Sequence, residues 1–150
     1  GENNSYHLQQ RGQVLCMPQT EWGATIQLAC CLATANQPIV VLDHNKQRLS
    51  HWLQQLPKDV AAFVIQASSV EQAVKQQTPG AALFEGDGDE LLVVAQQLAE
   101  HSAVIIQPQG RTVAEIEEGK SYRLERLLVE RSLSVNTAAA GGNATLMAMI

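Results

Sequence analysis

Five short apolar segments alternate with amphipathic, helix-like segments along most of this chain, and this alternation limits the fold more than any other feature. Repeated strand–helix units of this kind build a parallel sheet with helices on both faces. We therefore predict an α/β fold: a Rossmann-like, doubly wound domain over residues 13–110 with a mainly parallel five-stranded sheet. The strands are expected at residues 13–17, 38–42, 60–65, 81–84 and 103–107.

Four helix-like segments separate these strands, and each has a start signal. Thr20 can cap the first, over residues 21–35, and Asn45 opens the second, which Pro57 ends. The third and fourth begin with the capping-box patterns Ser68-x-x-Glu71 and Asp87-x-x-Glu90. The side chains expected to face inward are Trp22, Ile26, Ala29, Cys30 and Ala33 in the first helix, and Leu91, Leu92, Ala95, Leu98 and Ala99 in the fourth.

The two ends of the chain depart from the alternation. Residues 1–12 carry a weak strand pattern, and 122–135 interleave charges with Leu and Val, which predicts a two-stranded β-flap, although the second segment also suits a helix. Residues 111–121 form a polar connection without a clear pattern, and 136–150 form a nearly uncharged C-terminal tail. A two-stranded pair is marginal in water, so the flap is expected to need a partner surface.

Charge and residue usage exclude several classes of protein. A net charge of −5 gives no electrostatic basis for binding nucleic acid. No apolar run approaches the length of a membrane span, and the polar start without Met indicates a fragment of a longer, cytoplasmic protein rather than a signal peptide. The three cysteines, Cys16, Cys30 and Cys31, are expected to be reduced thiols packed in the core, and the four separated histidines do not predict a zinc site.

The turns that follow the strands do not predict a dinucleotide site. The G-x-G-x-x-G fingerprint should follow the first strand, but residues 17–23 there contain a proline and a single glycine. The sequence Gly86-Asp-Gly88 is flanked by acidic residues, which oppose phosphate binding. Asp43 and His44 form the best-placed acid/base pair but lack a third member. We therefore expect no catalytic, cofactor-binding or metal-binding residues in this chain.

Several parts of the sequence resemble one family of long enzymes. The run Val129-Glu-Arg-Ser-Leu-Ser-Val-Asn-Thr-Ala-Ala-Ala-Gly-Gly-Asn-Ala144 is similar to the extreme C-terminus of the proline utilization A (PutA) family. Shorter fragments agree with the family in the same order along the chain. They are Gly1-Glu2-x-Asn4-x-Tyr6, Val14-Leu-Cys16, Gln27-Leu-Ala29, Gly86-Asp-x-Asp89 and Leu124-Glu-Arg-Leu127.

The resemblance implies a function that the residues alone do not. PutA proteins join an FAD-dependent proline dehydrogenase to an NAD-dependent L-glutamate-γ-semialdehyde dehydrogenase, with a tunnel between them. Longer members carry a C-terminal domain similar to the Rossmann domain of aldehyde dehydrogenases, without its catalytic cysteine or a working NAD site. By this resemblance the chain packs on the aldehyde dehydrogenase module, covers the tunnel and binds neither cofactor. Peripheral membrane attachment of the parent protein is left open.

The C-terminal segment supplies the expected docking residues. Small residues allow close backbone approach, and polar side chains can hydrogen-bond a partner's backbone. The alternative for this segment is a flexible tail. Cut from its docking surface, the chain is expected to self-associate. The docking residues are Arg131, Ser132, Ser134, Asn136, Thr137, Gly141, Gly142 and Asn143.

Two further hypotheses compete with a docking domain. The first is a small-molecule or nucleotide-binding regulatory module that uses the strand ends near Asp43, His44 and Gly86. A stand-alone enzyme is the second, and it would require turnover by this chain itself.

Overall fold

The computed structural model describes residues 2–136 of the chain, and the chain divides into two compact units. Among the described residues, the larger unit comprises residues 10–128, and the smaller unit combines residues 2–9 with 129–136. Four of the expected docking residues, Thr137, Gly141, Gly142 and Asn143, lie outside the described residues.

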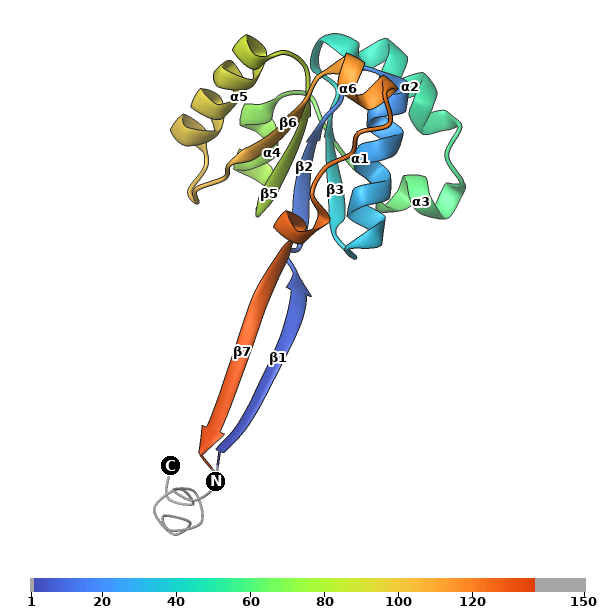
Figure 1. Ribbon diagram of the computed structural model, residues 1–150. Helices are drawn as coiled ribbons and strands as arrows, with labels where there is room; N and C mark the ends of the chain where they lie inside the picture. Colours follow the sequence, from blue (N-terminus) through green and yellow to red (C-terminus); the bar gives the residue numbers. More distant parts are fainter. Residues whose placement is uncertain (1, 137–150) are drawn as a thin grey trace. The chain divides into compact units, whose positions relative to one another are not determined.

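The larger unit is built on a five-stranded, fully parallel sheet (Figure 1). The strands lie in the order β4-β3-β2-β5-β6. The chain therefore adds β3 and β4 on one side of β2 and then β5 and β6 on the other side. This is the strand order of doubly wound dinucleotide-binding folds, with the switch point between β2 and β5. The strands are β2 (Gln13–Met17), β3 (Gln37–Val41), β4 (Ile65–Ala67), β5 (Ala81–Glu85) and β6 (Pro108–Arg111).

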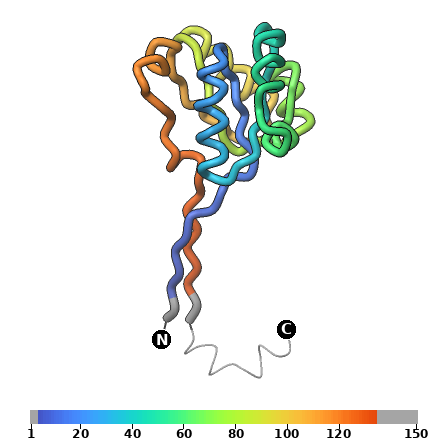
Figure 2. The backbone as a smooth tube through the Cα atoms, turned by 90° about the vertical axis from the view of Figure 1, so that its right-hand side faces the viewer, coloured from blue at the N-terminus to red at the C-terminus, as the bar shows by residue number. Residues whose placement is uncertain are grey.

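Helices pack on both faces of this sheet because successive strand residues point to opposite sides. Val14 and Cys16 of β2 belong to one apolar cluster, whereas Leu15 and Met17 belong to the other. The first cluster lies under α1 (Glu21–Ala33), α2 (Lys46–Gln54), α3 (Lys58–Phe63) and α6 (Val113–Glu117), and the second under α4 (Val70–Gln76) and α5 (Gly88–His101). The predicted doubly wound α/β class is confirmed. In Figure 2 the light-blue helix is α1, seen along its length.

Local capping signals place the helix starts. The Thr20 hydroxyl accepts a hydrogen bond from the Gly23 amide at 2.9 Å, and Asp87 and Glu90 form the expected reciprocal capping box of α5. The third capping prediction was wrong by one residue. Ser69, not Ser68, caps α4 by accepting from the Gln72 amide at 3.1 Å.

Two strand predictions were wrong. Most of residues 60–65 lies in α3, and β4 begins only at Ile65. Residues 103–107, predicted as the fifth strand, are not a strand, and β6 instead begins at the next residue, Pro108. Proline is tolerated as the first residue of an edge strand, since no ladder hydrogen bond needs its missing N–H. Val104 and Ile105 are 59% and 95% exposed, which β-branched content alone did not indicate.

The expected inner faces of two helices also need correction. In α1, Trp22, Ala29 and Ala33 are exposed, as are Leu92 and Ala99 in α5. The inner face of α1 was predicted from its apolar side chains, and this prediction was wrong because the buried face also includes a glycine and a glutamine. That face is formed by Gly23, Ala24, Gln27, Leu28, Cys30 and Cys31.

The smaller unit contains the two-stranded sheet predicted from the chain ends. β1 (Glu2–Gln10) and β7 (Leu128–Asn136) run antiparallel, side by side in both views (Figures 1 and 2). The Arg131 guanidinium donates through Nε to Gln9 Oε1 at 3.0 Å. The strand starts later than expected, since residues 124–127 form a 3-10 helix, η2 (Leu124–Leu127), and Tyr122 and Leu127 are buried in the larger unit.

Candidate functional site

The carboxyl ends of β2 and β5 meet at the switch point of the sheet, and α1 begins beside them. Ligands of doubly wound folds bind in this place, with phosphates at the amino terminus of the first helix. The chain fills this position with its own side chain. Glu85, the last residue of β5, is fully buried, with 0% of its surface exposed.

The Glu85 carboxylate binds the donors at the start of α1. Its Oε1 accepts from the backbone amides of Gln19 at 2.7 Å and Thr20 at 2.8 Å, and its Oε2 accepts from the Thr20 hydroxyl at 2.8 Å. The helix dipole stabilises an anion at this end. Glu85 is therefore an internal anion bound where a doubly wound nucleotide-binding fold would bind phosphate.

Gly23 makes room for this carboxylate. A Cβ atom built at Gly23 would overlap all three atoms of the Glu85 carboxyl group. Sequence reasoning missed this pair, since it counted Glu85 only among the acidic residues around Gly86-Asp-Gly88. The available signals were an acidic residue at the end of a buried strand and a glycine in the first turn of a helix.

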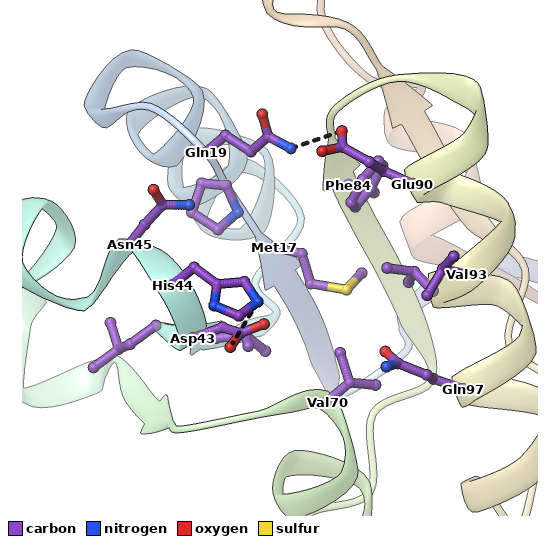
Figure 3. Close-up of a pocket in the computed structure, with 14 residues that line it drawn as sticks. Met17, Gln19, Asp43, His44, Asn45, Val70, Phe84, Glu90, Val93 and Gln97 are labelled. Carbon is purple, nitrogen blue, oxygen red and sulfur yellow. Dashed lines mark hydrogen bonds and ion pairs between the residues drawn. The ribbon is translucent and has the colours of Figure 1, made fainter.

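Beside this position lies a crevice of about 330 Å³ at the ends of β2, β3 and β5 (Figure 3). Met17 lies in its middle, the loop after β3 forms one wall, and α5 forms the opposite wall. Apolar lining comes from Met17, Pro18, Val41, Leu42, Val70, Phe84, Val93 and Val94, and polar lining from Gln19, Asp43, His44, Asn45, Glu90 and Gln97.

Asp43 and His44 do not form a catalytic dyad. His44 Nε2 lies 3.6 Å from Asp43 Oδ1, which is too long for a strong hydrogen bond, and both side chains are exposed. Asp43 has φ of 32°, a conformation that Asp and Asn adopt more readily than most residues. The pair therefore lies on the crevice wall as hydrogen-bonding groups rather than as an acid–base couple.

The thiols lie in the apolar core. Cys16 and Cys31 place their Sγ atoms 3.6 Å apart, and both are buried. The hydrogen bond with Cys31, together with burial, raises the pKa of the Cys16 thiol well above its usual range. A protonated, buried thiol is a poor nucleophile, which favours a packing role.

A buried polar network joins the segment before η2 to the sheet. The Tyr122 hydroxyl donates to the Phe84 carbonyl at 2.8 Å and accepts from Gln27 Nε2 at 3.0 Å. Burial raises the pKa of this tyrosine far above its ordinary value, so the hydroxyl stays protonated as a donor. The network therefore holds residues 121–127 against the end of β5, next to Glu85.

The expected docking residues that fall in the described chain all lie on β7. Arg131, Ser132 and Ser134 are exposed there, and Asn136 is its last residue. Within residues 2–136, no three His, Cys, Asp or Glu side chains gather as metal ligands would. The helices described in this range are all too short or too polar to cross a membrane.

Comparisons with known proteins identify relatives of the whole segment. No protein-family model matches the chain. It is 40% identical to the bifunctional protein PutA of Salmonella typhimurium over 98% of the chain and 10% of the relative. The bifunctional PutA proteins of Escherichia coli and Rhizobium meliloti are each 39% identical over 98% and 99% of the chain. The chain spans only about a tenth of the length of these relatives.

Proposed function

Because this chain is homologous over nearly its whole length to one segment of the bifunctional PutA proteins, we propose that it is a non-catalytic C-terminal domain of a bifunctional proline-catabolising enzyme. The rest of that enzyme oxidises proline with FAD and glutamate semialdehyde with NAD, in the cytoplasm. This domain packs on the aldehyde dehydrogenase module and covers the tunnel between the two active sites. It holds neither cofactor itself.

The Glu85 carboxylate is the observation that supports a non-catalytic role most directly. The amides of Gln19 and Thr20, which a pyrophosphate would need, already bind this side chain. A dinucleotide phosphate there would face a buried carboxylate instead of free donors. A doubly wound fold that has lost its phosphate site is suited to a structural role.

The two-stranded sheet supports the docking part of the proposal. Such a sheet is marginal in water by itself, and an exposed strand edge is a template for pairing with another segment. Tyr6, Leu8 and Leu133 are 64%, 56% and 58% exposed on its strands. Arg131, Ser132, Ser134 and Asn136 of β7, with Thr137, Gly141, Gly142 and Asn143 that follow, would bind the aldehyde dehydrogenase module.

The deciding experiment is coupled proline-to-glutamate turnover by the parent enzyme after removal of residues 131–150. We expect aldehyde oxidation to fall or NADH to appear after a lag, because the intermediate escapes, while proline oxidation stays intact. Arg131→Ala should reproduce part of this defect, whereas Arg123→Ala, an exposed arginine of the larger unit, serves as the charge-matched control. Full coupled activity without a lag in the deletion variant would refute the docking role.

A second measurement separates this proposal from a stand-alone enzyme. The purified chain is mixed with glutamate semialdehyde and NAD, and NADH formation is followed. We expect no turnover and no NAD-dependent rise in melting temperature, because a ligand of the folded state must stabilise it. Turnover by the chain alone would overturn the non-catalytic assignment.

A further inference from the structure

The crevice beside Glu85 has no part in the docking role, yet it has the properties of a small-molecule site. Its volume of about 330 Å³ lies at the lower end of the range for small-ligand pockets. It opens outside the carboxyl ends of β2, β3 and β5, at the switch point where doubly wound sheets bind their ligands. The fold therefore places it where a ligand is expected.

The apolar part of the crevice suits a flat, uncharged ring. The Met17 side chain lies between the two walls, with Phe84 and Val93 on the α5 side (Figure 3). Met17 and Phe84 are 6% and 5% exposed, so they form a fixed floor rather than a mobile rim. Thioether and aromatic side chains make favourable contacts with heteroaromatic rings.

The polar wall of the crevice includes a hydrogen-bond acceptor, Asp43, at the position where dinucleotide-binding folds bind ribose. Asp43 follows β3, the second strand of the sheet in chain order, and lies about 20 residues beyond the first turn of α1. An acidic residue there accepts hydrogen bonds from ribose hydroxyls in dinucleotide-binding folds. The Asp43 carboxylate is 56% exposed and lies on the crevice wall beside His44. A vicinal diol is the group that matches this acceptor.

Phosphate, in contrast, does not match this crevice. Glu85 already fills the anion position at the start of α1, and the Glu90 carboxylate lies next to it on the rim, accepting from Gln19 Nε2 at 2.9 Å. Among the described residues that line the crevice there are two carboxylates, one imidazole and neither Lys nor Arg. An anionic ligand would therefore meet like charges and unavailable donors.

We propose that this crevice binds a nucleoside-like ligand, with its base over Met17 and Phe84 and its ribose diol on Asp43, and that it rejects the phosphorylated form. This site is independent of the docking surface on β7. A domain that has closed its phosphate position can keep the base and ribose parts of the crevice, because Glu85 ends β5 whereas Asp43 follows β3.

The test is photo-crosslinking of 8-azidoadenosine to the full-length protein that carries this chain, with the labelled peptides mapped by mass spectrometry. We expect labels within residues 17–19, 41–45 or 84–97. Unlabelled adenosine should compete, whereas AMP and 2′,3′-dideoxyadenosine should compete at least about tenfold less well, since one adds a phosphate and the other lacks the diol. Mapping keeps this result separate from labelling at other sites of the protein.

Two variants and a control sharpen the test. Asp43→Asn keeps the positive-φ preference but removes the charge, and Val93→Trp fills the crevice from its exposed wall. Both should reduce labelling at least about tenfold, and Asp59→Asn, an exposed residue of α3, should not. Absence of label from these segments, or equal competition by AMP or by dideoxyadenosine, would overturn the proposal. It would leave the coupled-turnover result for the docking role unaffected.

Discussion

Glu85 and Gly23 depend on each other although they are far apart in the sequence. The carboxylate needs the space that only glycine leaves, and the amides of Gln19 and Thr20 need the carboxylate. The two positions should therefore couple strongly in stability.

A double-mutant cycle tests this coupling by urea denaturation. Glu85→Ala should cost about 3 kcal/mol, because buried donors lose their acceptor. Gly23→Ala should cost about 2 to 3 kcal/mol alone, because the new methyl overlaps the carboxylate. In the Glu85→Ala background the same Gly23→Ala change should become neutral or stabilising by up to about 1 kcal/mol, as alanine favours a helix.

Gly88→Ala is the matched control for this cycle. Gly88 also lies in the first turn of a helix, but a Cβ there would meet no atom within 4 Å. Its substitution should leave the free energy of unfolding near that of the unaltered chain in both backgrounds. Equal costs for Gly23→Ala with and without Glu85 would contradict the coupling.

Sequence reading succeeded at single residues only where the partner is close in the chain. Thr20 and Asp87 could be identified as helix caps because each bonds an amide three residues later. Glu85 could not, since Gln19 precedes it by 66 residues and only the fold brings them together. For the same reason, the sequence showed that the glycine motif for phosphate binding is missing. It did not show that the Glu85 carboxylate occupies the phosphate position.

At the scale of elements, an ion pair joins the last residue of β6, Arg111, to Glu115 in the first turn of α6. The Arg111 guanidinium donates to Glu115 at 2.8 Å, and the Thr112 hydroxyl caps the same turn by accepting from the Glu115 amide. The hydrogen bond from Arg111 lowers the pKa of Glu115 below its ordinary value. Because the pKa of Glu115 is lower in the folded than in the unfolded state, its carboxylate stabilises the folded state at pH values above the unfolded-state pKa. This stabilisation is lost as the pH falls through the folded-state pKa of Glu115.

Glu115→Gln should therefore destabilise the chain at pH 7, and the difference from the unaltered chain should shrink in acid, below the ordinary glutamate pKa of 4.5. Urea denaturation across this pH range measures it. The comparison is repeated in an Arg111→Ala background, where most of the pH-dependent difference should be lost, because Arg111 is the main cause of the lowered pKa of Glu115. A pH-dependent difference of the same size in that background would show that the ion pair is not its source.

The two wrongly predicted strands, β4 and β6, show that a local residue pattern does not determine where an edge strand begins. Residues 103–107 and 60–65 are apolar and partly β-branched, yet the sheet uses Pro108–Arg111 and Ile65–Ala67 instead. Strand identity at a sheet edge is decided by register with the inner neighbour, here Ala82 opposite Pro108. The inner strands β2, β3 and β5 are buried on both faces, so their apolar runs predicted them within one residue at either end.

At the scale of the whole molecule, the chain consists of a well-packed unit and a unit with a two-stranded sheet. Two strands bury too little apolar surface to be stable alone, and in the described chain β1 and β7 pair only with each other. In the proposed parent enzyme a partner surface would cover them. When the chain is purified by itself, a second copy of the same chain can provide this surface.

We therefore expect the purified chain to self-associate through β1 and β7, with a sedimentation coefficient that rises over an about hundredfold range of concentration, as mass action requires. Tyr6 and Leu8 are exposed and lie on one face of β1, so Tyr6→Lys with Leu8→Lys should shift the equilibrium toward monomer by charge repulsion. Gln54→Lys with Gln55→Lys, at two exposed positions at the end of α2, adds the same charge and should not shift it. A concentration-independent monomer would mean that the sheet needs no partner, and it would remove this physical reason for docking.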